Sequence, residues 1–113
     1  MRQGYVYVMT NTRNGTLYIG VTNDIVRRVH EHRTGNTPSF TQRHGLKRLV
    51  WYETHADVPT AIRREKAMKA WQRAWKLRLI EATNPEWNDL WPGLFGEGLS
   101  VEVWLMQNFS NET

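Results

Sequence analysis

Two short runs of β-branched and aromatic residues lie on either side of an Asn-Gly pair near the start of the chain. Residues 5–9 read Tyr-Val-Tyr-Val-Met and residues 17–21 read Leu-Tyr-Ile-Gly-Val, with Asn14 and Gly15 between them. Asn-Gly is favoured in tight turns because both residues tolerate positive φ angles, and flanking runs of this composition are typical of strands. The pattern predicts a β-hairpin, which commits this part of the chain to an antiparallel sheet.

The hairpin pattern also predicts which side chains share a face. If Asn14 and Gly15 occupy the tip, paired positions sum to an odd number, and Tyr7 and Tyr18 project from the same face. The opposite face then takes the aliphatic side chains Val6, Val8, Leu17 and Ile19. This simplest register still offsets the two tyrosines by four residues, about 14 Å along the strands. A longer turn or a bulge is needed to bring their hydroxyls near each other.

A helix is predicted directly after the hairpin. Residues 22–24 (Thr-Asn-Asp) offer N-cap side chains, apolar residues recur at helical spacing over residues 25–29, and Gly35 is a typical C-terminal stop. Arg28 and His32 are four residues apart, so they stack on one side of this helix at the edge of its apolar stripe. Edge positions can be held by packing and still be open to a ligand.

The later elements are less sharply marked. Residues 34–45 are polar and read as a loop, and residues 46–53 are a candidate third strand. Residues 59–83 are good helix formers and fit either one long helix or two helices with a bend near residues 71–75. The alternating residues 101–105 fit a strand, a short helix or a partner-binding segment.

Bulk composition narrows the class of protein. The 113 residues are 40% apolar and 12% aromatic, which is enough for one domain with its own core. There is no cysteine, which excludes disulfides and cysteine-bound zinc. Because the sequence contains neither a signal-like segment nor about 18 consecutive apolar residues, we expect a cytoplasmic protein that does not enter a membrane.

Charge is distributed unevenly along the chain. All 15 Lys and Arg residues lie at or before Arg78 together with five acidic residues, so this segment carries +10. The last 35 residues hold six acidic residues and no base, a charge of −6. The asymmetry favours a basic face that binds a polyanion, with a tail that stays off that face or folds back over it. The alternative is a basic surface that is merely solvated.

Several of these side chains could act together on a phosphodiester. Hydrolysis needs a deprotonated water, a cation against the charge of the transition state and usually a divalent metal ion. Tyrosine, arginine and histidine could supply the first two. Glu65 is the natural metal ligand, because it is the sole acid in a helical stretch rich in bases: Arg63, Arg64, Lys66, Lys69, Arg73, Lys76 and Arg78.

Each candidate also has an ordinary structural interpretation. Tyrosines in strands are commonly core residues whose hydroxyl lies at the rim. Arg28 could be a plain surface residue, and His32 a semi-buried histidine with a satisfied ring. Glu65 and Lys69 could form an i, i+4 ion pair that stabilises the helix by a few tenths of a kcal/mol.

Taken together, the residues resemble the GIY-YIG endonuclease superfamily, and especially its short stand-alone bacterial members. The first motif appears as Tyr-Val-Tyr ending at Tyr7, and the second as Tyr-Ile-Gly beginning at Tyr18, eleven residues later. Arg28 follows after ten residues and His32 after four more. The resemblance covers residues 4–92 and includes three further segments: residues 47–53 (Lys-Arg-Leu-Val-Trp-Tyr-Glu), 64–66 (Arg-Glu-Lys) and 84–87 (Asn-Pro-Glu-Trp).

The resemblance implies a fold and a reaction. The fold is an α+β domain with a small three-stranded antiparallel sheet flanked by helices, in the order β-β-α-β-α-α. We expect this nuclease-like domain over residues 1–92 and an acidic C-terminal extension of unknown role over residues 93–113. The implied reaction is endonucleolytic cleavage of DNA with one divalent cation, Mg²⁺ or Mn²⁺.

Roles for individual residues follow from the same resemblance. Tyr7 would act as or assist the general base for the attacking water, and Tyr18 would orient water or phosphate. Arg28 would stabilise the charge of the transition state, and His32 would relay a proton. Glu65 would hold the metal ion.

Further positions complete the expected site. Gly20 belongs to the second motif, and a family asparagine is assigned to Asn84, with Asn88 as the alternative. The first motif departs from Gly-Ile-Tyr but keeps its functional tyrosine. Candidates for contacts with nucleic acid are the basic residues Arg27, Arg43, Lys47, Arg48, Arg64 and Lys69.

The expected partner is DNA, possibly branched or nicked, in repair or recombination. We expect a monomer or weak homodimer, with a possible protein partner bound through the tail. Two other functions stay open from sequence: a catalytically silent nucleic-acid-binding module, and an interaction protein that uses its acidic tail.

Overall fold

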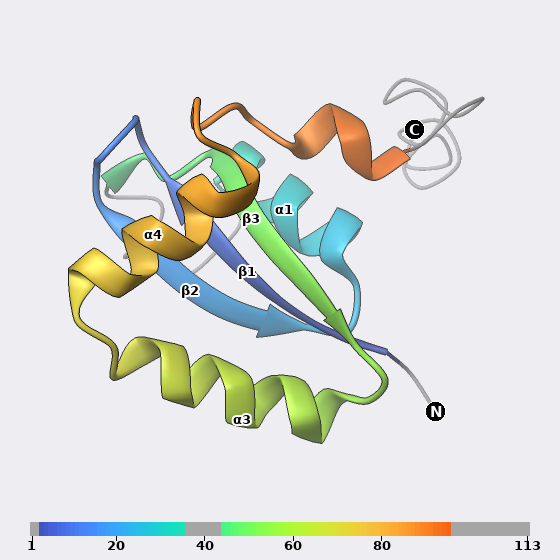
Figure 1. Cartoon of the computed structure of the whole chain (residues 1–113). Coiled ribbons are helices and arrows are strands. Elements are labelled where there is room, and N and C mark those ends of the chain that lie inside the picture. Colours follow the sequence, from blue (N-terminus) through green and yellow to red (C-terminus); the bar gives the residue numbers. More distant parts are fainter. Residues whose placement is uncertain (1–2, 36–43, 96–113) are drawn as a thin grey trace, which may run out of the picture.

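The computed structural model describes residues 3–35 and 44–95 (Figure 1). In these residues the elements follow the order β-β-α-β-α-α and end in a short 3₁₀-helix. They are β1 (Gly4–Thr10), β2 (Leu17–Thr22), α1 (Ile25–Thr34), β3 (Arg48–His55), α3 (Val58–Lys69), α4 (Arg73–Thr83) and η1 (Trp91–Phe95). The expected fold class is confirmed. The alternating segment at residues 101–105 lies outside the described residues.

The sheet has the strand order β2-β1-β3, with β1 antiparallel to both neighbours. Its hairpin is not paired in the simplest register. Tyr7 pairs with Gly20 and Tyr18 with Met9, so the two tyrosines are offset by two residues instead of four. The expected shared face is confirmed, and of the alternatives left open by the sequence the longer turn is the one observed.

The loop over residues 11–16 explains the difference in register. It is longer than a two-residue turn, and Gly15 N–H donates to the Thr12 carbonyl at 2.9 Å, with Asn14 at φ 59°. The Arg73 guanidinium at the start of α4 donates to the carbonyls of Asn14 and Gly15 at 2.8 and 2.7 Å. The loop is therefore held from a helix far along the chain.

Helix α1 begins and ends at the residues that the sequence indicates. The Asp24 carboxylate accepts from Arg27 N–H at 3.2 Å, which satisfies a donor at the start of the helix. At the other end Gly35 adopts φ 83°, the left-handed conformation that glycine tolerates best. The two caps define where α1 begins and ends, and Arg28 and His32 lie between them.

The long helical stretch is divided into two helices. Helix α3 ends at Lys69, and Gln72 takes an extended conformation with ψ 149° before α4 begins at Arg73. The two-helix alternative is confirmed. No helix in the described ranges combines the length and apolarity that crossing a bilayer requires.

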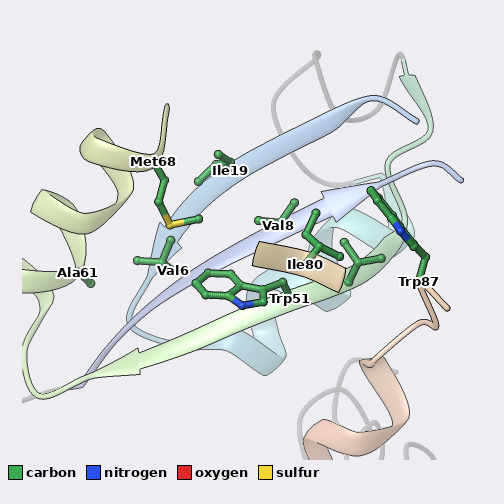
Figure 2. Packing of buried hydrophobic residues seen from close by; sticks show 9 residues of the cluster. Val6, Val8, Ile19, Trp51, Ala61, Met68, Ile80 and Trp87 are labelled. Atoms are coloured by element: carbon green, nitrogen blue, oxygen red, sulfur yellow. The ribbon is translucent and has the colours of Figure 1, made fainter. Parts of the chain in front are cut away.

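Both faces of the sheet are covered. On one face the strands pack against α3 and α4, and Figure 2 shows the side chains of the core between them. This first core contains the buried side chains Val6, Val8, Ile19, Val50, Trp51, Ala61, Met68, Ile80 and Trp87. On the other face α1 and η1 cover a second core, made of Tyr7, Met9, Ile25, Val29, Leu46, Leu49, Trp91 and Phe95. The tyrosine-bearing face therefore belongs to the second core.

Asn84 caps α4 and connects it to the sheet and to the following turn. Its amide nitrogen donates to the carbonyls of Val50 at 3.0 Å and Asn88 at 2.9 Å, and its amide oxygen accepts from Asn88 N–H at 3.0 Å. The side chain is 4% exposed. Three hydrogen bonds in a buried setting account for an asparagine here on structural grounds alone.

We expect Asn84→Ala to lower the free energy of unfolding by about 2–4 kcal/mol, because it leaves buried backbone groups without partners. Asn88→Ala is the matched control, since Asn88 takes part through its backbone and its side chain is exposed. That control should change stability by less than about 0.5 kcal/mol. Urea denaturation of both variants measures the difference, and equal losses would contradict the structural role of the amide.

Candidate active site

Tyr7, Tyr18 and His32 converge on the α1 face of the sheet. The Tyr7 hydroxyl and His32 Nε2 are joined by a buried hydrogen bond of 2.9 Å. The ring centroid of Tyr18 lies 6.3 Å from that of Tyr7 and 5.4 Å from that of His32. Three residues that are distant in sequence thus form one cluster, with Tyr7 and His32 buried and Tyr18 partly exposed.

Gly20 makes room for this cluster. It pairs with Tyr7 across the hairpin, and a Cβ atom at position 20 would lie 2.5 Å from Tyr7 Cζ and 2.9 Å from Tyr18 Cε2. Real Cβ atoms do not approach other atoms so closely. A glycine is therefore required for both tyrosine rings to lie over the strand as they do.

Burial fixes the charge states of the hydrogen-bonded pair. It raises the pKa of the Tyr7 hydroxyl far above its ordinary value, and Tyr18 adds to this effect while Arg28 opposes it. Burial, followed by the charge of Arg28, lowers the pKa of His32 to about 4. At neutral pH the tyrosine is therefore a hydroxyl and the histidine is uncharged. His32 Nδ1 is buried and has no hydrogen-bond partner among the described residues.

Arg28 lies one turn before His32 on α1. Its positive charge lowers the pKa of both Tyr7 and His32. It is half-buried and forms an ion pair of 3.6 Å with Glu31, one turn along α1. Glu31 also raises the pKa of Tyr7. Sequence reasoning did not single out Glu31, although its i, i+3 spacing from Arg28 is the signal that could have found it.

Glu65 lies on α3, the helix that contacts β1 and β2. Its carboxylate is 13% exposed and pairs with Lys69 Nζ at 3.3 Å. Lys69 and Lys76 line a hollow of about 320 Å³ together with Tyr18. The basic end of α3 therefore meets the outer strand beside the second tyrosine. Lys76 is named above only as one of the bases around Glu65, and its position beside Tyr18 follows from the break between α3 and α4.

The remaining candidates lie apart from the tyrosine cluster. Asn84 bonds to β3 and to the turn after α4, as described above. Arg27 pairs with Asp24 at 3.9 Å, and Arg64 is held by Glu53 at 3.0 Å. Lys47 and Arg48 line a separate pocket. Arg43 lies outside the described residues.

This arrangement, with two tyrosines on a hairpin facing an arginine and a histidine on the next helix, defines a GIY-YIG catalytic domain. The family model described as "GIY-YIG catalytic domain" matches residues 3–78. The chain therefore belongs to the GIY-YIG family. Domains of this family are generally endonucleases, and they typically use divalent metal ions.

Relatives of the chain are UPF0213 proteins, small stand-alone GIY-YIG proteins. The one from Staphylococcus epidermidis is 31% identical over 72% of this chain and 98% of its own length. The one from Aeromonas salmonicida is 29% identical over 74% of this chain, and the match spans 62% of that protein. The solution NMR structure of the UPF0213 protein from Bacillus halodurans has 28% identity and a TM-score of 0.49, covering 77% of this chain and 92% of the other.

We expect Gly20→Ala to lower the free energy of unfolding by about 1–3 kcal/mol, because the added methyl group overpacks the tyrosine cluster. The rings of Tyr7 and Tyr18 must shift, so their NMR chemical shifts should change more than those of the first core. Gly93→Ala is the matched control, since a Cβ atom there meets nothing within 4 Å. Unchanged tyrosine signals in the Gly20 variant would contradict the assigned packing.

We expect stability to fall as pH drops, with His32 as one cause. In the unfolded chain the histidine has its ordinary pKa of 6.5, whereas in the folded chain its pKa is about 4. Its contribution is therefore complete above pH 6.5 and is lost as pH falls toward 4. Between pH 7.5 and pH 5 the loss is about 2 kcal/mol. Urea denaturation at the two pH values should show a smaller drop for His32→Gln than for the wild type.

Proposed function

We propose that this chain is an endonuclease that hydrolyses DNA phosphodiester bonds with the help of Mg²⁺ or Mn²⁺. The observation that carries the proposal is the buried hydrogen bond of 2.9 Å between the Tyr7 hydroxyl and His32 Nε2, with Tyr18 against both rings. A core position gains nothing from two polar groups that apolar residues could replace. A hydrogen-bonded tyrosine and histidine can move a proton, which gives such a pair a chemical use.

The pair provides a path for the proton of the attacking water. With the ring proton on Nδ1, His32 Nε2 accepts from the Tyr7 hydroxyl, whose oxygen keeps a lone pair for a water molecule. As the water oxygen bonds to phosphorus and the bond to the leaving oxygen breaks, the water proton passes to Tyr7. The tyrosine proton passes to His32. Because His32 is uncharged at neutral pH, it is ready to accept that proton.

Arg28 and Tyr18 act on the phosphate. The guanidinium lies close enough to influence both partners of the pair, and its charge would offset the negative charge that develops on the phosphoryl oxygens. Tyr18 lies between the cluster and the hollow that Lys69 and Lys76 line. Its hydroxyl would orient the phosphate between the proton path and these lysines.

Glu65 fits the role of metal ligand. No group of three or more His, Asp or Glu side chains in the described ranges could hold an ion by itself. Mg²⁺ keeps most of its waters and is commonly bound by one or two carboxylates and the phosphates of the substrate, so one glutamate suffices. When bound, the ion would polarise the phosphate and stabilise its charge. Lys69 pairs with Oε1 of Glu65, which leaves Oε2 for the ion.

The substrate follows from charge and size. The segment up to Arg78 carries +10, which suits a polyanion. We therefore propose weak sequence specificity with selection of DNA structure, such as branches or nicks, as in repair or recombination. A monomer or weak homodimer in the cytoplasm fits this role.

We expect the purified protein to cleave nicked, branched or duplex DNA with Mg²⁺ and not with EDTA. Tyr7→Phe removes the hydroxyl of the proton path and should lower the cleavage rate by about 10²–10⁴-fold. Glu65→Gln should abolish cleavage at low Mg²⁺ and leave DNA binding in EDTA unchanged. Tyr5→Phe is the matched control, because that hydroxyl bonds to Gln3 away from the cluster, and it should cleave normally.

The results separate the alternatives. Cleavage that persists in both Tyr7→Phe and Glu65→Gln would contradict the proposed mechanism. Binding of DNA without cleavage by the wild type would favour a silent nucleic-acid-binding module instead.

A further inference from the structure

A second pocket, of about 510 Å³, lies across α1 from the tyrosine cluster. Helical spacing puts Arg28 and His32 on one side of buried Val29, and His30 and Arg33 on the other. The pocket is lined by the His30 and Arg33 side of α1, by residues at the start of β3 and by η1. Its lining includes His30, Arg33, Lys47, Arg48 and Trp91. The mechanism proposed above uses none of these residues.

The pocket carries net positive charge on well-held side chains. Arg33 donates to Asp89 Oδ2 at 2.6 Å and to the Lys47 carbonyl at 3.2 Å, and Arg48 donates to the Trp87 carbonyl at 3.1 Å. Lys47 is exposed, and its ammonium has no ion-pair partner within residues 3–35 and 44–95. Three cations therefore face one carboxylate.

The carboxylate of Asp89 has a structural role. Asp89 Oδ1 accepts from Leu49 N–H at 3.3 Å and from Trp91 N–H at 3.0 Å, while Oδ2 accepts from Arg33. Its oxygens are engaged by the walls of the pocket and do not cancel the charge of Lys47. Trp91 is 5% exposed and forms a flat floor, with Arg33 5.2 Å above its ring. The pocket is thus preorganised, which lowers the entropy cost of binding a ligand.

We propose that this pocket binds a phosphodiester of the DNA that flanks the cleavage position. The inference rests on the proposed nuclease function. A helix is about 10 Å across, so the pocket is about that far from the Tyr7–His32 pair. Each step along one strand of duplex DNA rises about 3.4 Å along the axis and also winds around it, so phosphates about 10 Å apart are only about two steps apart. DNA that crosses the C-terminal part of α1 would place one phosphate at the tyrosines and a second at Lys47.

The test measures binding of fluorescently labelled duplex DNA in EDTA as a function of salt. We expect Lys47→Gln to weaken binding by about three- to tenfold near 0.1 M salt and to reduce the slope of log affinity against log salt by about 1, as for one lost phosphate contact. Under cleavage conditions KM should rise while kcat stays unchanged. Lys66→Gln is the matched control, because Lys66 is exposed on α3 and lies in neither site.

A second measurement locates the contact. In a series of duplexes shortened stepwise from each side of the cleavage position, wild-type affinity should drop sharply at one step, about two pairs from the cut. The Lys47→Gln protein should lack that step. Competition by inorganic phosphate, with no step in the series, would indicate a general anion site and overturn the inference.

The remaining outcomes are distinguishable. If Lys47→Gln and Lys66→Gln lose affinity and salt dependence equally, the pocket inference fails, and the proposed function stands as long as the wild type cleaves DNA. If the wild type neither binds nor cleaves DNA, both fail together.

Discussion

The burial of strand β1 on both faces is the constraint on which the rest of the structure depends. It pairs with β2 and β3 at its two edges, with α3 and α4 packed on one face and α1 on the other (Figure 1). A polar side chain on either face of such a strand is buried, which costs free energy unless it finds a hydrogen-bond partner. The Tyr7 hydroxyl is accommodated there by its hydrogen bond with His32, which reaches it from α1. The contact that satisfies a buried hydroxyl of β1 is therefore also the contact that joins Tyr7 to His32.

This arrangement carries a cost in stability that the surroundings must offset. Tyr7 and His32 are both held in one protonation state by burial, and His32 Nδ1 has no partner among the described residues. Buried polar groups that lack a partner cost roughly 1–3 kcal/mol each. The apolar residues around the pair, including Val29 and Met9, are fully buried and supply the compensating burial. The cluster is thus a buried polar feature inside an otherwise apolar core, as is common at functional sites.

Local patterns were sufficient to predict most of the elements. The caps of α1 at Asp24 and Gly35 are short-range features, and so is the shared face of Tyr7 and Tyr18. The register of the hairpin was not predictable, because its loop is held by Arg73 from nearly sixty positions away. Burial of His32, and with it the low pKa of its ring, depends on α1 packing against β1 and β2. The roles of Lys76 and Asn84 likewise depend on contacts between elements that no local pattern encodes.

The contact of Arg73 with the hairpin loop has a further consequence. Its two hydrogen bonds connect the first turn of α4 to the backbone that determines how far apart Tyr7 and Tyr18 lie along the strands. The start of α4 follows Lys69, the partner of Glu65, by only a few residues. The spacing of the two tyrosines and the placement of the single carboxylate are therefore mechanically linked. A displacement of the start of α4 would therefore change the spacing of the tyrosines and the position of the Glu65 carboxylate together.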